Sequence, residues 1–148
     1  QTDIAGNLSA STASGTALTV DTSVGMPAFA LALDTGASAS DGVTRNATID
    51  VSLALDAASW EYSLDGGASW NAGSGTGFTL AASSYAAGSV QVRQTDIAGN
   101  LSAAATNAAA ITVDTAVPAP GFALALDTGA SASDGVTRNA TVDVSLAL

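Results

Sequence analysis

Hydrophobic residues alternate with small or polar ones along most of this chain. Between positions 49 and 55 every second residue is Ile, Val or Leu, and the residues between them are Asp, Ser or Ala. Successive side chains of a strand point to opposite faces, so a period of two is typical of half-buried strands. The same alternation occurs at Phe29, Leu31 and Leu33, at Trp60, Tyr62 and Leu64, at Phe78 and Leu80, at Val90 and Val92, and at Ile111 and Val113.

The segments between these apolar runs are rich in Gly, Ser, Asp and Asn, which are turn formers. We read about six or seven short strands in about 90 residues, with no helical stretch, and this spacing is typical of an Ig-like β-sandwich. The predicted fold class is therefore all-β. We expect Trp60 to be the core aromatic residue of the third strand, and Tyr85 to sit at a corner before the strand that contains Val90.

A repeat of 93 residues organises the chain. Residues 1–10, QTDIAGNLSA, recur letter for letter at 94–103, and 43 of the 55 positions in 1–55 are identical in 94–148. The copies differ mostly in or just before the two proline-containing stretches, which we take as joints because proline cannot donate to a sheet and stiffens a linker. We expect residues 1–20 to be the C-terminal part of a preceding repeat. Residues 21–114 would be a complete repeat, and residues 115–148 the N-terminal part of the following one.

The charge balance limits the classes of molecule that the chain can be expected to bind. The chain has three Lys and Arg and thirteen Asp and Glu, which gives a net charge of −10. Nucleic acids and anionic membranes both attract cationic surfaces, so neither is an expected partner. The chain has no cysteine, which excludes a disulfide framework, and its apolar runs are too short for a membrane span.

Residues 31–36, LALDTG, recur at 124–129 and resemble the active-site motif of aspartic proteases, in which two Asp carboxylates share a proton. The alternative is a strand that ends in an Asp turn. No segment reads as a protease flap or as a second hydrophobic-Gly motif, so we expect a turn and no enzymatic activity.

Residues 63–70, SLDGGASW, fit the Asp-box pattern of sialidases, where the box is a hairpin away from the catalytic centre. Asp65 and the two glycines after it favour a tight turn that Trp70 anchors. We therefore interpret this motif as a structural hairpin. The N-x-S/T sequons beginning at Asn7, Asn46, Asn100 and Asn139 are potential glycosylation sites that we expect to remain largely unmodified.

Acidic residues gather in the predicted turns. Within one unit the carboxylates are Asp34, Asp41, Asp50, Asp56, Glu61, Asp65, Asp96 and Asp114. When Ig-like domains are joined end to end, a linker carboxylate comes near loops of both neighbours. Carboxylates that converge without a Lys or Arg repel one another, and Ca²⁺ relieves this because it takes 6–8 oxygen ligands. The alternative is that each acid is solvated and caps its own turn.

Residues 96–102, D-x-A-G-N-x-S, followed by ITVDT at 111–115 and a proline, resemble the Ig-like repeats of giant type I-secreted bacterial adhesins of the RTX type. Residues 60–67, WEYSLDGG, belong to the same pattern. The resemblance implies an extracellular extender at the bacterial cell surface, in biofilm or host adhesion. Such repeats hold a ligand-binding domain, located elsewhere in the full protein, away from the cell. Neighbouring repeats of the same chain would be its partners, and Ca²⁺ at the junctions would stiffen the rod.

By that resemblance the candidate calcium ligands form two sets. Asp96 and Asp114, with Asp34, Asp41, Asp127 or Asp134, are expected at the joint that follows the complete unit, and Asp3 and Asp21 at the joint before it. The alternative function is an Ig-like module that itself binds carbohydrate or a host surface. Such a module needs an exposed aromatic side chain, and Trp70 is the candidate.

Overall fold

The computed structural model describes residues 1–146, and strands are the only regular elements in them. In chain order they are β1 (Ala28–Leu31), β2 (Val43–Thr44), β3 (Thr48–Ser52), β4 (Ala57–Ser63), β5 (Asn71–Ala72), β6 (Gly77–Thr79), β7 (Ser83–Tyr85), β8 (Gln91–Asp96), β9 (Ala105–Thr106), β10 (Ile111–Val113), β11 (Gly121–Leu124) and β12 (Val142–Ser145). The predicted all-β fold class is confirmed.

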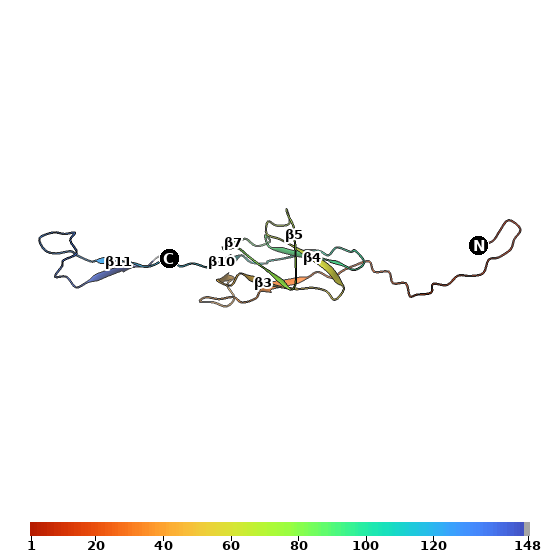
Figure 1. The fold of residues 1–148 in the computed structure, drawn as a ribbon, viewed down its shortest axis with the longest axis horizontal. Coiled ribbons are helices and arrows are strands. Elements are labelled where there is room, and N and C mark those ends of the chain that lie inside the picture. The colour runs from red at the N-terminus through yellow and green to blue at the C-terminus, as the bar shows by residue number, and fades with distance from the viewer. Residues whose placement is uncertain (147–148) are drawn as a thin grey trace.

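Strands β1 to β10 form a central body of three small sheets (Figure 1). One sheet has the order β1-β3-β6, a second has the order β5-β4-β8-β9, and a third has the order β2-β10-β7. All pairs in them are antiparallel except β2 with β10, which run parallel. The parallel pair ties the loop before β3 to the last strand of the body.

The β4–β8 pair is the longest ladder, running from Ala57 opposite Asp96 to Ser63 opposite Gln91. Along β8 every second side chain is buried, as the alternation in the sequence predicted. The same strand therefore directs Val92 into the core and places Gln94 and Asp96 in buried positions as well.

One apolar cluster joins the sheets. Its buried members are Ile49, Val51, Trp60, Leu80, Val90, Val92, Ile111 and Val113. Trp60 lies 6.1 Å from Phe78 between ring centroids, and Tyr62 stacks on Phe78 at 4.2 Å. Trp60 is thus the core aromatic residue, as predicted. All eight positions belong to the period-two runs of the sequence.

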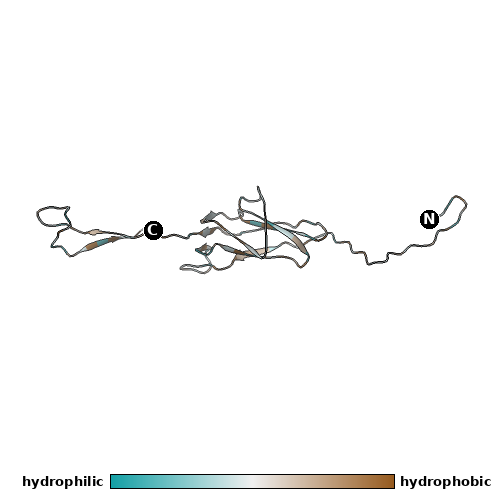
Figure 2. Cartoon of the chain, viewed as in Figure 1, coloured by the Kyte–Doolittle hydropathy of each residue, from teal (hydrophilic) through white to brown (hydrophobic). Residues whose placement is uncertain are grey.

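The segments on either side of the body are extended and expose their apolar side chains. Residues 1–20 contain only the isolated bridge between Thr2 and Leu8, and β11 pairs with β12 in a two-stranded sheet. The two segments leave the body at opposite ends (Figure 1). Figure 2 shows hydrophobic residues on the β11–β12 pair as well as on the strands of the body.

Gly73 tests the packing around Trp60. A Cβ atom at Gly73 would lie 2.1 Å from Cδ2 of Trp60, so the indole would have to move. We expect Gly73→Ala to lower the free energy of unfolding by about 1–3 kcal/mol, the usual cost of overpacking a core. Chemical denaturation followed by tryptophan fluorescence measures this. Gly25→Ala, where a Cβ meets nothing within 4 Å, is the matched control and should leave stability nearly unchanged.

Candidate metal centre at the linker

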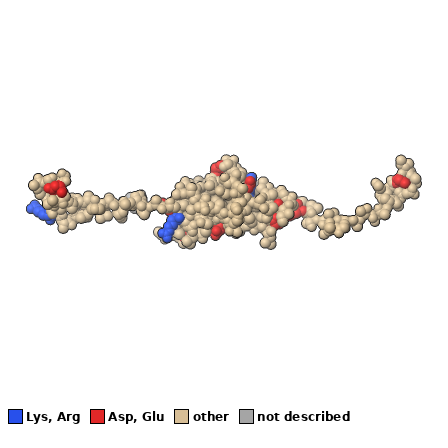
Figure 3. Space-filling view, viewed as in Figure 1, with Lys and Arg blue, Asp and Glu red and all other residues tan. Residues whose placement is uncertain are grey.

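Three carboxylates meet where the N-terminal linker, residues 21–27, enters the body. Asp21 of the linker, Asp56 before β4 and Asp96 at the end of β8 each place an oxygen within 4.8 Å of the other two. The β4–β8 ladder explains why Asp56 lies near Asp96, because Ala57, the residue after Asp56, lies opposite Asp96. Figure 3 shows acidic atoms at this end of the body. In residues 1–146 the one ion pair joins Arg93 to Glu61, so none of the three carboxylates is neutralised by a basic side chain.

Asp96 is 2% exposed and is held by its own turn. Its carboxylate accepts hydrogen bonds from the backbone N–H of Asn100 and from Nδ2 of Asn100, both at 2.8 Å. Burial works against the charged form, but these bonds, with those from the Gly99 and Ala98 N–H groups, outweigh it and lower the pKa of Asp96 below its usual value. The site therefore keeps a buried negative charge.

The linker is fastened to this end of the body by two amide side chains. Nδ2 of Asn100 donates to the Asp21 carbonyl at 3.2 Å. Gln94, fully buried, donates from Nε2 to the Gly25 carbonyl at 2.7 Å and accepts from the Ala54 N–H at 3.0 Å. The same turn that holds Asp96 thus also holds the backbone of the linker.

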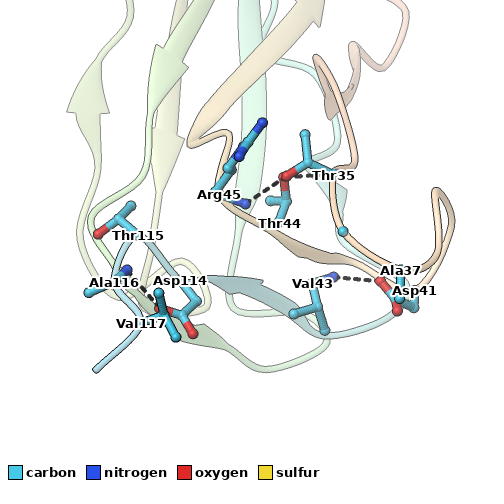
Figure 4. Close-up of a pocket in the computed structure, with 11 residues that line it drawn as sticks. Thr35, Ala37, Asp41, Val43, Thr44, Arg45, Asp114, Thr115, Ala116 and Val117 are labelled. Atoms are coloured by element: carbon cyan, nitrogen blue, oxygen red, sulfur yellow. Dashed lines mark hydrogen bonds between the residues drawn. The ribbon is translucent and has the colours of Figure 1, made fainter. Parts of the chain in front are cut away.

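Asp114 lies at the other end of the body. It follows β10 and lines a shallow hollow together with Thr35, Asp41, Arg45 and residues 115–117 (Figure 4). Asp114 and Asp41 come from opposite sides of this hollow, and each caps a local backbone N–H, that of Ala116 and that of Val43. Arg45 also lines the hollow, so its lining is not purely acidic.

The grouping differs from the one that the sequence suggested. Asp96 lies with Asp21 and not with Asp114, because β8 and β10 end at opposite ends of the body. Asp3 is not part of the cluster and caps its own turn through Asn7. Asp114 and Asp3 occupy the same positions in the repeat as Asp21 and Asp96, and the carboxylate cluster is seen at Asp21.

The remaining candidate ligands are held inside single loops. Asp34 accepts from the Gly42 N–H at 2.9 Å, and Asp127 accepts from the Gly135 N–H at 3.0 Å. Oδ1 of both carboxylates is buried without a hydrogen-bond partner. Asp134 caps the Val136 N–H at 3.0 Å. Asp34 and Asp127 therefore form matching turns, each closed by one of these hydrogen bonds.

Sequence reasoning missed two residues of the site. Asp56 was one of eight acids in the unit, and only its position opposite the end of β8 distinguishes it. Gln94 reads as an ordinary polar strand residue, although its place in phase with Val90 and Val92 indicates an inward side chain.

The Asp-box forms the predicted hairpin. β4 pairs with β5 around it, and the Asp65 carboxylate accepts from the backbone and hydroxyl of Ser69 and from the Ser63 hydroxyl. Nε1 of Trp70 donates to the Gly67 carbonyl at 3.1 Å, and the guanidinium of Arg93 lies 3.9 Å from the Trp70 ring centroid. One ring face of Trp70 is thus occupied by a cation–π contact.

A scan against protein-family models finds no match, and a search of curated proteins finds no similar relative. Within the described part of the chain, no helix is long and apolar enough to cross a membrane.

Acid titration tests the Asp-box. Hydrogen bonds from the Ser69 side chain, the Ser69 N–H and the Ser63 side chain lower the pKa of Asp65 to about 2. A depressed pKa means that this carboxylate stabilises the fold above pH 3.8, and that the contribution is lost as the pH falls from 3.8 to about 2. NMR titration of the side-chain carboxyl carbon should give this value, and Ser69→Ala should raise it. An unchanged pKa in Ser69→Ala would contradict the assignment.

Gln94→Met tests the attachment of the linker. Methionine fills a similar volume but leaves the Gly25 carbonyl and the Ala54 N–H without their partner. We expect a loss of about 1–3 kcal/mol in the free energy of unfolding, because two hydrogen bonds worth about 0.5–1.5 kcal/mol each are removed. Gln91→Met on the same strand, where the amide bonds only the Gly88 carbonyl, should cost less. Equal losses in thermal denaturation would show that the linker contact contributes little.

Proposed function

We propose that this chain is a stretch of non-catalytic extender repeats from a large bacterial surface adhesin. Its role is to form a rod that holds a distal binding domain away from the cell. The observation that carries the proposal is the linker: Asp21, the first residue after the segment of the preceding repeat, is bound by Asn100 beside Asp56 and Asp96. In an array of such units, the 93-residue repeat would place the same contact at each joint.

An Ig-like sandwich is the fold that best accounts for the strand pairing. In that fold the strands C and F pair in one sheet and A, B and E lie in the other. The order β5-β4-β8-β9 matches C′-C-F-G, and β1-β3-β6 matches A-B-E. Trp60 occupies the core position of strand C, and the Tyr85 hydroxyl bonds both backbone groups of Ala81, as a corner tyrosine does. These features support the assignment.

The linker site suits a hard cation. Three carboxylates without a basic partner repel one another, and carboxylate oxygens are the ligands that Ca²⁺ prefers. Asp21, Asp56 and Asp96 would hold the ion, and water would supply the other oxygens. An ion there would tie the linker to the following unit more tightly than Asn100 and Gln94 do alone. Extracellular modules bind Ca²⁺ at about 10⁻⁴–10⁻³ M, which fits an extracellular location at the cell surface.

No observation favours the alternative, a carbohydrate-binding module. The aromatic residue that it requires, Trp70, has one face covered by Arg93 and its N–H bonded to Gly67. Trp60 and Tyr62 are packed with Phe78. A spacer needs no such surface.

Calcium binding can be measured on residues 1–148 directly. We expect 1 mM Ca²⁺ to add about 1.4 kcal/mol to the free energy of unfolding if the dissociation constant is about 10⁻⁴ M. For a body of about 90 residues the melting temperature should rise by about 6–11 °C relative to EDTA. Asp56→Asn should abolish the rise while leaving the melting temperature in EDTA unchanged or higher, because it removes one repelling charge.

Asp41→Asn is the matched control, since Asp41 is an exposed turn acid at the opposite end of the body. It should respond to Ca²⁺ as the wild type does. Small-angle scattering on a longer array should show the maximum dimension growing in proportion to the number of units and increasing with Ca²⁺. If Ca²⁺ does not change the melting temperature but the maximum dimension still grows with the number of units, the cation mechanism is wrong and the spacer role stands. If the maximum dimension does not grow with the number of units, the spacer role is wrong.

A further inference from the structure

The body exposes large apolar side chains at its two ends. Within residues 28–113, all of which the structure describes, the exposed large hydrophobic residues are Leu33, Val43, Leu55, Ile97 and Leu101. The last three lie in the turns at the end that the N-terminal linker enters. Leu33 and Val43 lie at the opposite end, beside Thr44, whose hydroxyl donates to the Leu33 carbonyl. In residues 28–113 the sides of the body between these ends therefore expose none of them.

One position of the repeat is held by both ends of a body. The Asp114 N–H donates to the Thr44 carbonyl at 2.9 Å, so this residue is fixed to the unit that it ends. At the equivalent position the Asp21 carbonyl accepts from Nδ2 of Asn100 at 3.2 Å, so this residue is fixed to the unit that it begins. Consecutive Cα atoms are only about 3.8 Å apart. In an array, no spacer therefore separates one body from the next.

The rest of the linker runs along the unit that follows. The Gly25 carbonyl accepts from Nε2 of Gln94 at 2.7 Å, and Pro27 is buried. Residues 22–27 are therefore not available to hold two bodies apart.

The end of the unit before the joint has an apolar residue beside this shared position. Val43 lines the same hollow as Asp114 and is 49% exposed. Figure 4 shows Val43 between Asp114 and Asp41. A neighbour attached at residue 114 therefore meets Val43 first, with Leu33 nearby.

The end of the unit after the joint has two such residues. Asp21 lies with Asp56, and Leu55, the residue before Asp56, is 109% exposed. The Ile97 N–H donates to the Asp56 carbonyl at 3.0 Å, and Ile97 is 82% exposed. Two aliphatic side chains thus project beside the point where the preceding body is attached.

Aliphatic residues are unusual at the turn tips of this body. Residues 65–69 read DGGAS and residues 73–76 read GSGT, which are small or polar turn formers. A leucine at the tip of the turn before β4 and an isoleucine in the turn after β8 depart from that composition. A cover that removes them from water accounts for both.

We propose that successive units pack directly on one another, with Leu55 and Ile97 of each unit against Val43 of the unit before it. This contact rests on the proposed array of repeats, and its partner is another copy of the repeat in the same chain. Removing these side chains from water stabilises the joint without a cation. Bending the joint exposes them again, so the contact opposes bending on its own.

A chain in which residues 21–113 occur twice in succession, between the natural flanking residues, tests this contact because it contains two complete bodies. The measurement is made in EDTA, where the proposed cation contributes nothing. Its melting temperature should exceed that of the 148-residue chain by about 4–8 °C, because aliphatic side chains become buried at the new joint. NMR residual dipolar couplings should give the two bodies one common alignment.

The two copies provide the matched control. Leu55→Gln combined with Ile97→Gln adds no charge, so the carboxylate cluster keeps its charge. In the second copy this pair faces the first body and should abolish the rise in melting temperature. In the first copy, which no complete body precedes, the same pair should leave the rise intact. Val43→Gln should act in the opposite order, with a loss in the first copy and none in the second.

Equal effects of the Leu55→Gln and Ile97→Gln pair in the two copies would overturn the contact. A two-body chain that melts in EDTA at the temperature of the 148-residue chain would overturn it as well. The spacer role has a separate readout, the growth of the maximum dimension with the number of units. Growth without a rise in melting temperature contradicts the contact and leaves the spacer role standing. A rise without growth supports the contact and contradicts the spacer role.

Discussion

The antiparallel pairing of β4 with β8 is the contact on which the rest of this structure depends. It brings Trp60 and Val92 into one core, and it ends with Ala57 opposite Asp96. Because side chains alternate along β8, the strand that fills the core with Val92 also buries Gln94 and Asp96. The packing of Trp60 and Val92 in the core and the position of Asp96 in the candidate metal centre thus both follow from the register of β4 against β8. A shift by one residue would turn all three of these side chains to the opposite face.

Gln94 and Asp96 link the core to the chain outside it. A buried amide and a buried carboxylate are costly unless they are hydrogen-bonded, and here the partners are the linker carbonyl of Gly25, the Ala54 N–H and the turn at Asn100. The stability of the body therefore favours a linker held in place. The rod that we propose requires a linker of this kind, because a linker held by one unit can pass its orientation to the next. In that proposal calcium would strengthen an attachment that the side-chain amides of Gln94 and Asn100 already make.

Parts of the repeat occur twice in this chain, once in the body and once in a flanking segment. Comparing the two copies distinguishes the features that nearby residues determine from those that tertiary contacts determine. The turn at Asp3 has the hydrogen bonds of the turn at Asp96, and the loop at Asp127 has those of the loop at Asp34, although neither flanking segment has a core. These turns are specified by nearby residues, since Asp, Asn and Gly satisfy the local backbone themselves. Burial does not follow the local sequence: Leu18 and Val20 are exposed where Ile111 and Val113 are buried. The same strand sequence is a core element only when other sheets cover it.

The sequence by itself determined the all-β class, the apolar face of each strand, the 93-residue repeat, the core position of Trp60 and the Asp-box hairpin. Each of these depends on spacing along the chain or on turns of a few residues. Tertiary structure alone decided which carboxylates meet. Asp96 and Asp114 are near in sequence and were expected together, but they end strands at opposite ends of the body, while Asp21 and Asp56 reach Asp96 from 75 and 40 residues away. Strand direction and pairing order set those distances, and neither is encoded in the period-two pattern.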